Sequence, residues 1–360
     1  MKRLAFLLAA AFVLELAFPP RYAAAAEALR SPFTAIVQRD MSHGAASSGA
    51  CTPALPVPRD LFGVSYYVDS AHHSIADPAL QKKNVEQLKP VRDYLAGIVR
   101  MTDAAVQGSA SDGDCAFAWF QAGATSGGLL GDVNRQGGYE REWTLCGLAL
   151  EYLKLRDTGR LSDGGARATV ELWLDRIARA VRPVAEKENE RNNHAYWTGL
   201  GVAAAGIAAN DRELFEWGIS KYTLGDGMIA ADGTLPLEMA RGRRALHYHF
   251  YALAPLVMLA ELGEANGLDL YARSGGALHR LVKRVVAGFH DPSWFASRAG
   301  VAQDIAANGS LAVDEAGWME PYSARFGPSD LSDILQKFRP VIDPRYGGNV
   351  TALYAAASKT

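Results

Sequence analysis

Two stretches of this chain are apolar on every side of a helix, and they constrain the fold more than any other feature. Residues 198–209 contain almost only Gly, Ala, Leu, Val and Ile, and residues 251–260 are similarly apolar. A helix of this composition is normally buried all round, and neither stretch is long enough to cross a bilayer. Both must therefore be covered by other helices of the chain.

The other helical patterns are amphipathic. Val170, Trp173, Leu174, Ile177 and Val181, for example, fall on one helix face, whereas strand-like alternation is scarce. Clusters of Gly, Asp, Asn and Pro separate the candidate helices. These helices are predicted over residues 79–106, 114–123, 139–157, 164–182, 194–209, 212–222, 244–263, 275–289 and 329–338.

Wholly buried helices that alternate with amphipathic ones indicate two concentric layers. We therefore predict an all-α fold, a toroid built from helical hairpins. A globin-like or orthogonal bundle is the alternative, and composition separates the two poorly. The chain shows no repeat and no shift in composition that demands a second domain, so residues 27–360 are predicted to form one domain.

The first 26 residues have the pattern of a secretory signal peptide. Lys2 and Arg3 precede an apolar run, and the alanines at 23–26 provide a cleavage site after Ala26. A membrane anchor is the alternative, but the run is short and Glu15 interrupts it. We expect a periplasmic or secreted protein that has no membrane insertion once the signal is removed.

Export permits disulfides, and the chain has three cysteines. Cys51 lies in a Ser/Thr/Pro-rich stretch, Cys115 follows a polar turn, and Cys146 lies in an apolar helical run. We predict that Cys51 pairs with Cys115 and ties the N-terminal arm to the body. Cys146 is then a buried free thiol. The spacing matches no zinc site.

The charge balance restricts the partners. The formal net charge is −2, and it becomes −4 without the signal peptide. Nucleic-acid binding draws on a broad basic surface, so this chain is a poor candidate. Any anionic ligand must meet a local cluster, for which the sequence offers Arg241, Arg243, Arg244 and Arg345.

Polar residues gather where each of the two apolar helices begins. Asn193, His194 and Trp197 open the first, while Arg244 and Tyr251 lie nearly one above the other at the start of the second. Capping and aromatic packing are the alternative explanation. Parallel inner helices would bring the two groups together. His249 points away from Arg244 and is left out of catalysis.

Asn, His, Arg and Tyr suit β-elimination from a uronic acid. Hydrogen bonds that neutralise the carboxylate make the C5 proton more acidic, and a tyrosine beside arginine can remove that proton and protonate the leaving oxygen. A hydrolase would need two carboxylates across a cleft. Asp132, Glu140 and Glu142 are available, but nothing singles them out.

The motifs Asn-Asn-His-x-Tyr-Trp at 192–197 and Arg-Ala-Leu-x-Tyr-His-x-Tyr-Ala-Leu at 244–253 resemble the bacterial alginate lyases of polysaccharide lyase family five, the mannuronate lyases. Trp-Met-Glu-Pro-Tyr at 318–322 and Arg-Tyr-Gly-Gly at 345–348 are similar too. The resemblance runs from Cys51 to the end. It implies an incomplete α/α toroid with a tunnel-like cleft and no metal or other cofactor.

The resemblance also implies roles for single residues. Asn193 and His194 match the pair that neutralises the carboxylate, and the histidine can also act as base. Arg244 matches an arginine that supports the carboxylate or the tyrosinate, and Tyr251 matches the catalytic tyrosine. Trp197 matches a sugar-stacking wall, and Arg345 matches a late arginine that contacts substrate. The other residues expected at the cleft, with core packing as the alternative for Trp143, are Tyr66, Tyr67, Arg141, Trp143, Arg241, His247 and Tyr248.

Residues 65–70 occupy the position of the family's lid over the cleft, although a surface loop with exposed aromatics is the alternative. Tyr66 stands where some members have lysine, so the preferred uronate stays open between mannuronate and glucuronate. His247 stands where some members have alanine, and its extra imidazole is expected to broaden or shift the pH range of activity. We expect a monomeric lyase that cleaves an anionic polysaccharide by β-elimination, namely alginate with mannuronate preferred, and polyglucuronate as a further substrate. The alternative is a non-catalytic polyuronate-binding or export-scaffold protein on the same toroid.

Overall fold

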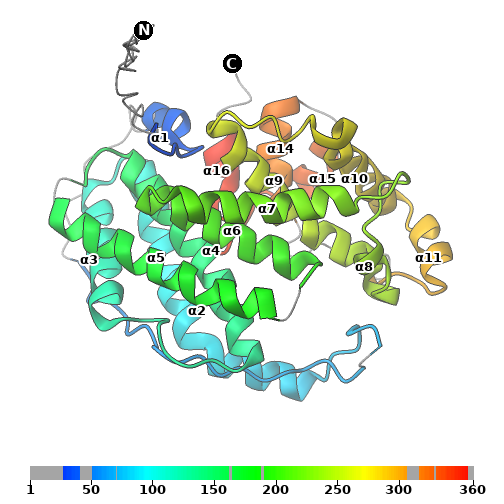
Figure 1. The fold of residues 1–360 in the computed structure, drawn as a ribbon, viewed down its shortest axis with the longest axis horizontal. Helices are drawn as coiled ribbons and strands as arrows, with labels where there is room; N and C mark the ends of the chain where they lie inside the picture. The colour runs from blue at the N-terminus through cyan, green and yellow to red at the C-terminus, as the bar shows by residue number, and fades with distance from the viewer. Residues whose placement is uncertain are drawn as a thin grey trace, which may run out of the picture.

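The computed structural model describes residues 27–40, 51–69, 71–161, 164–187, 190–305, 316–327 and 330–355. The predicted signal peptide, residues 1–26, lies outside this part of the chain. Across the described residues the protein is mainly helical, and Figure 1 shows helices crossing the molecule in layers.

All the helices predicted from the sequence are confirmed. They are α2 (Pro78–Val106), α3 (Ala110–Ser126), α4 (Arg135–Asp157), α5 (Gly164–Lys187), α6 (Asn193–Ala209), α7 (Arg212–Met228), α9 (Ala245–Ala265), α10 (Arg273–His290) and α15 (Leu331–Phe338).

Shorter elements were not predicted. They are α1 (Thr34–Asp40), α8 (Pro236–Met239), the 3₁₀ turn η2 (Gly242–Arg244), α11 (Ser293–Ala299), α14 (Met319–Phe326), α16 (Val350–Ala355) and the antiparallel strands β1 (Ile342–Asp343) and β2 (Gly348–Asn349). Most span two turns or fewer, too short for a hydrophobic period to stand out.

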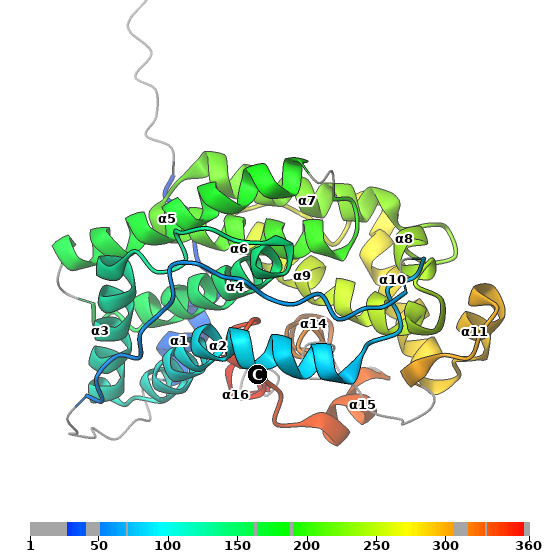
Figure 2. The same ribbon diagram turned by 90° about the horizontal axis from the view of Figure 1, so that it is seen from below.

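Helix α6 lies at the centre of the fold. It packs against α4 and α9 on its flanks and against the outer helices α5 and α7 (Figures 1 and 2). As predicted, α6 and α9 are buried nearly all round. The outer helices bury one face each. The fold is therefore the expected α/α toroid of two helical layers.

Helix α4 is a third inner helix, which the sequence did not reveal. It is buried along almost its whole length although it carries Glu140, Arg141, Glu142, Glu151 and Lys154. Most of these charged groups find partners inside the protein, so they do not bring the helix to the surface.

Glycines set the distance between α6 and α7. A Cβ atom on Gly218 would lie 2.4 Å from the carbonyl oxygen of Gly199, and one on Gly206 would lie 2.6 Å from the backbone nitrogen of Phe215. Side chains at these positions would push the outer layer away from the inner one.

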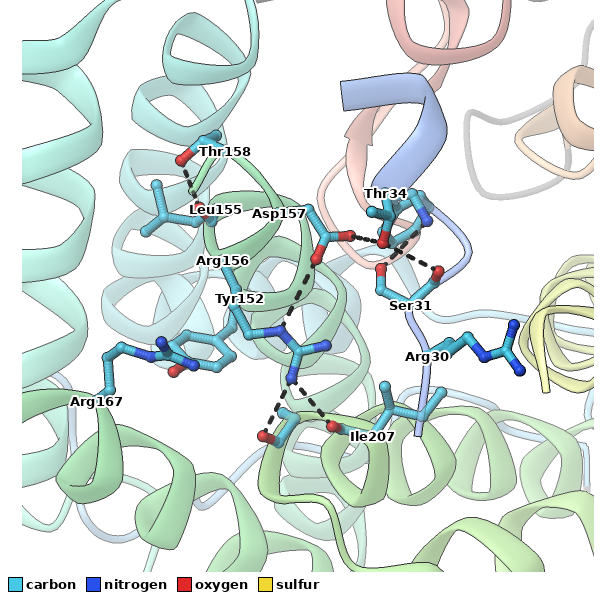
Figure 3. A network of polar contacts seen from close by, with 12 residues as sticks. Arg30, Ser31, Thr34, Tyr152, Leu155, Arg156, Asp157, Thr158, Arg167 and Ile207 are labelled. Carbon is cyan, nitrogen blue, oxygen red and sulfur yellow. Dashed lines mark hydrogen bonds and ion pairs between the residues drawn. The ribbon is translucent and has the colours of Figure 1, made fainter. Parts of the chain in front are cut away.

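The N-terminal segment crosses the ends of the inner helices, on the side where α4 and α6 terminate (Figure 3). Thr34 Oγ1 donates to Asp157 Oδ2 at 3.0 Å. Arg156 donates to the carbonyl of Ile207 at 3.1 Å, at the C-terminal end of α6. The Ile207 carbonyl also accepts from the backbone nitrogen of Asn210 at 3.4 Å, so the arginine adds a charged donor at the negative end of the helix dipole.

An extended arm, residues 51–69 and 71–77, covers another part of the fold. Figure 2 shows it running from the end near α3 to the end near α8. The predicted disulfide Cys51–Cys115 attaches the start of the arm to α3, while Cys146 is a buried free thiol. Farther along, the backbone nitrogen of Leu61 donates to the carbonyl of Asp132 at 2.9 Å.

Candidate active site

A cleft of roughly 670 Å³ lies where the arm, the start of α4, the starts of α6 and α9, and a C-terminal loop meet. The two groups of polar residues predicted to lie together do so here. The cleft is lined by the predicted site residues Tyr66, Tyr67, Trp143, Asn193, His194, Arg241, Arg244, His247, Tyr248, Tyr251 and Arg345.

Asn193 is the first residue of α6 and is fully buried. Its backbone nitrogen donates to Glu238 Oε1 at 2.7 Å, and its amide Nδ2 lies 3.0 Å from both carboxylate oxygens of Glu238. Its carbonyl Oδ1 is buried and has no partner among the described residues. The amide nitrogen, which the expected role directs at a substrate carboxylate, is thus held by Glu238.

His194 lies against the aromatic side chains of α4. Its ring stacks on Tyr139 at a centroid distance of 4.0 Å, with Trp143 at 6.2 Å. Burial, and then the positive charges of Arg241 and Arg135, lower the pKa of His194 to about 3. Because its Nδ1 is buried, Nε2 is the nitrogen that can reach the cleft. The imidazole is neutral at ordinary pH.

Arg244 connects the arm to the start of α9. One guanidinium nitrogen donates to the hydroxyl of Tyr67, and the other lies 2.7 Å from Nε2 of His247. Tyr248 donates to Tyr67 at 3.2 Å. Residues 65–69 and 71–73 therefore reach across the cleft, in the position expected for a lid.

Tyr251 completes the row on α9. Its ring is parallel to that of His247, with centroids 6.3 Å apart, and perpendicular to that of Tyr248 at 6.2 Å. Trp197 packs behind Tyr251 at a centroid distance of 5.2 Å. The proposed acid/base group is thus held between aromatic rings and exposes 6% of its surface to the cleft.

Neighbouring tyrosines keep their protons. Burial is the main cause that raises the pKa of Tyr66, Tyr67, Tyr139 and Tyr248, and it outweighs the opposing effect of nearby arginines. These four hydroxyls act in the cleft as hydrogen-bond donors and acceptors rather than as bases.

The cleft is strongly basic although the chain is slightly acidic. Among the described lining residues, Glu190 is the one carboxylate, against six arginines: Arg92, Arg135, Arg191, Arg241, Arg244 and Arg345. Arg92 is neutralised by Glu140 in a two-bond pair at 2.7 Å. The remaining charge suits a polyanion.

Three residues expected near the ligand lie elsewhere. Arg141 is buried and donates to the carbonyls of Gly131 and Ala180, so its guanidinium faces the outer layer. Trp197 is fully buried and cannot form a sugar-stacking wall. Arg243 pairs with Asp304 at 2.6 Å and does not line the cleft. Their positions in the sequence, close to the expected site residues, did not reveal what covers or binds them in the structure.

The acidic residues considered for a hydrolase do not form a pair across the cleft. Glu140 is bound to Arg92. Glu142 is buried behind the site, where burial and the charge of Glu190 raise its pKa well above the usual range. Asp132 lies outside the cleft lining. No group of three or more His, Cys, Asp or Glu in the described part of the chain could hold a metal ion.

Sequence reasoning missed Tyr139, Arg135 and Glu238. Tyr139 precedes Trp143 by one helical turn, which was a usable signal for a shared face. Glu238 comes from the short helix α8 and meets Asn193 across 45 residues of sequence. No local pattern predicts such a contact.

A two-layer helical toroid with this cleft is the framework of a polysaccharide lyase. Residues 63–295 match the family described as "Alginate lyase". The chain is 39% identical over 315 residues to a polysaccharide lyase of Stenotrophomonas maltophilia, covering 86% of this chain and 92% of the relative. It is 34% identical to an alginate lyase of Azotobacter vinelandii, covering 93% and 92%. The chain belongs to the alginate lyase family.

Solved structures agree with this assignment. Alginate lyase A1-III from Sphingomonas species A1 superimposes with a TM-score of 0.74 at 27% identity, covering 91% of this chain and 97% of that one. A variant of that lyase complexed with a tetrasaccharide superimposes with a TM-score of 0.77 at 26% identity, with the same coverage. The incomplete toroid expected from the resemblance is therefore confirmed, and the chain is a polysaccharide lyase.

Proposed function

We propose that this protein cleaves alginate, preferentially at mannuronate, by β-elimination. The observation that carries the proposal is one basic cleft in which Arg244, neutral His194 and Tyr251 share the wall. Such a cleft can neutralise a uronate carboxylate and move a proton without a second acidic group.

The bond changes follow from the groups present. Arg244 and the Nε2–H of His194 bind the substrate carboxylate and stabilise the enediolate that forms when C5 loses its proton. Tyr251, as tyrosinate, takes that proton. The C4–O bond then breaks, a C4–C5 double bond forms, and Tyr251 returns the proton to the leaving oxygen. Tyr251 thus acts as both base and acid from one face of the sugar ring, as syn elimination from mannuronate requires.

His194 is a poor alternative base. A group with a pKa of about 3 has little tendency to take a proton at neutral pH. Its role in this proposal is that of a neutral donor. Asn193, whose amide nitrogen is bound to Glu238, offers Oδ1 and accepts a hydrogen bond from a substrate hydroxyl.

The choice among uronates rests on the lid. Tyr66 and Tyr67 line the cleft with rings tilted by 43° to each other, at a centroid distance of 4.8 Å, where a lysine would supply a charge. Aromatic faces select by shape rather than by charge. We therefore include polyglucuronate as a second substrate of this proposal.

We further propose that the protein is exported, is cut after Ala26, and works as a monomer in the periplasm or outside the cell. The disulfide Cys51–Cys115 supports export because such bonds persist in oxidising compartments. Among the described residues, no helix is long and apolar enough to span a membrane. N-terminal sequencing of the protein from the periplasm, and its mass in solution, test these points.

The deciding experiment is a substrate panel read by ultraviolet absorbance, which reports the new C4–C5 double bond. Polymannuronate, polyguluronate, polyglucuronate and hyaluronan are compared across pH. The proposal predicts the highest kcat/KM on polymannuronate. Faster cleavage of polyguluronate would overturn the preference, and tight binding without any rise in absorbance would favour a non-catalytic binding protein.

A further inference from the structure

One face of α4 holds the C-terminal loop. Trp143, Gly147, Glu151 and Lys154 are spaced by four, four and three residues, so they form a single stripe along the helix. We call these four residues the docking stripe. The loop that joins β1 to β2 lies against it and carries Arg345.

The contact is close at the middle of the stripe. A Cβ atom on Gly147 would lie 2.3 Å from the carbonyl oxygen of Pro344. Gly348 has a φ of +75°, and a Cβ there would lie 2.7 Å from Asp103 Oδ2 and 2.8 Å from Glu151 Oε1. Because one of the blocking atoms at Gly147 is backbone, any side chain there displaces the loop.

Charged groups fix the loop at the other end of the stripe. Lys154, 1% exposed, donates to the carbonyl of Gly347 and to Asp103, both at 2.7 Å. Its Nζ also lies 2.9 Å from Glu151 Oε2, outside hydrogen-bond geometry. Asp103 in turn accepts from the backbone nitrogen of Asn349 at 2.9 Å.

A buried ion network of this kind contributes little net stability compared with apolar residues of the same volume. The network instead determines the position of the loop, because one of its hydrogen bonds ends on the loop carbonyl of Gly347 and another on the backbone nitrogen of Asn349 in β2, which follows the loop. At the far end of the stripe, the guanidinium carbon of Arg345 lies 4.6 Å from the centre of the Trp143 ring, inside the cleft.

We propose that the docking stripe, together with Asp103, positions Arg345 for binding a uronate carboxylate, and that Gly147 and Lys154 are positioning residues for the lyase. The proposal rests on the proposed function for the nature of the ligand. In this proposal the buried charges Glu151 and Lys154 of α4 take no part in the elimination itself. They contribute to substrate affinity by holding the loop that carries Arg345.

The test is a double-mutant cycle with Gly147→Ala and Arg345→Ala, measured on the polyuronate that the wild-type protein cleaves. We expect each single change to raise KM about tenfold and to leave kcat within about twofold, since one charge-assisted contact is weakened. In the Arg345→Ala background, Gly147→Ala should have almost no further effect. Gly138→Ala is the matched control, because its Cβ meets only Val133, at 3.8 Å.

Asp103→Asn provides a milder second variant if Gly147→Ala does not fold, as checked by thermal unfolding. Its rise in KM should also vanish in the Arg345→Ala background. Folded Gly147→Ala or Asp103→Asn proteins with wild-type KM would overturn the proposal, and so would an equal rise in both backgrounds. Absence of any cleavage by the wild-type protein would instead reject the proposed function.

Discussion

Nη2 of Arg244 lies 2.7 Å from Nε2 of His247, one helical turn away on α9. A guanidinium only donates hydrogen bonds, so the imidazole accepts and carries its proton on Nδ1. The other arm of the guanidinium is bound to Tyr67. Arg244 is thus held between the helix and the lid before any substrate arrives.

His247→Ala should lower kcat/KM about tenfold, because Arg244 loses the acceptor that orients it. His247→Gln should recover most of this loss, since its amide oxygen can accept from the same nitrogen. Steady-state kinetics on polymannuronate distinguish the two variants. Equal losses in both would show that the imidazole itself, rather than an acceptor, is needed.

Tyr251→Phe should abolish turnover and leave polymer binding nearly unchanged, because it removes only the group that moves the proton. Absorbance measures turnover, and calorimetry with an oligosaccharide measures binding. Tyr248→Phe is the control, as its hydroxyl donates to Tyr67 and takes no part in proton transfer. Measurable turnover by the Tyr251 variant would refute its assigned role.

His249 predicts one component of the acid sensitivity. Burial lowers its pKa from 6.5 to about 4, so in this range the unfolded chain binds a proton that the folded chain does not. The free energy of unfolding therefore falls as the pH drops from about 6.5 to about 4, by about 1.4 kcal/mol per pH unit from this residue. Its stabilising contribution is complete above that range.

His249→Gln should be less stable at pH 7, because the hydrogen bond that the backbone nitrogen of Leu235 donates to Nε2 is weakened. Its unfolding free energy should nevertheless decline less steeply with acid. Denaturant titrations at several pH values provide the slopes. A slope identical to that of the wild-type protein would contradict the assignment.

Removal of the disulfide by Cys51→Ser with Cys115→Ser should reduce stability by about 3–4 kcal/mol, because the bond closes a loop of 64 residues. Urea unfolding with and without reductant measures the loss. Cys146→Ala should leave the response to reductant unchanged, since that thiol is unpaired. A reductant effect that persists in the double serine variant would point to another cause.

The sequence predicted those parts of the structure that depend on local pattern. The apolar helices α6 and α9 were recognised as buried because their apolar stretches are almost uninterrupted by polar residues. Parallel packing of the two helices then predicted that the polar residues at their starts lie together. Helix α4 was missed as an inner helix because Glu151 and Lys154 interrupt its apolar pattern. Lys154 pairs with Glu151 on the same helix, and its other partners lie on α2 and on the C-terminal loop, which no local pattern reveals.

The site shows the same division. Helical spacing put Trp197 near Asn193, and the structure places it behind Tyr251, where burial removes it from the ligand. The orientation of the Asn193 amide depends on its hydrogen bonds to Glu238 on α8. No sequence motif near either residue predicts this contact. The helical periodicity of the sequence predicts which helix a residue belongs to. The tertiary contacts of that residue determine which of its atoms can still bind a substrate.

The arm that crosses the cleft is held at both ends. The disulfide and the Leu61 backbone fix one end, and Asp77, which caps α2 by accepting from Ala79 and Leu80 at 2.9 Å, fixes the other. Only the short stretch between them is left to rearrange when a sugar unit enters. Backbone hydrogen bonds from Val68 to Ile75 and from Asp77 to Tyr66 restrain this stretch as well, so few backbone torsions remain to lose freedom when a polymer binds and the entropic cost of binding here is small.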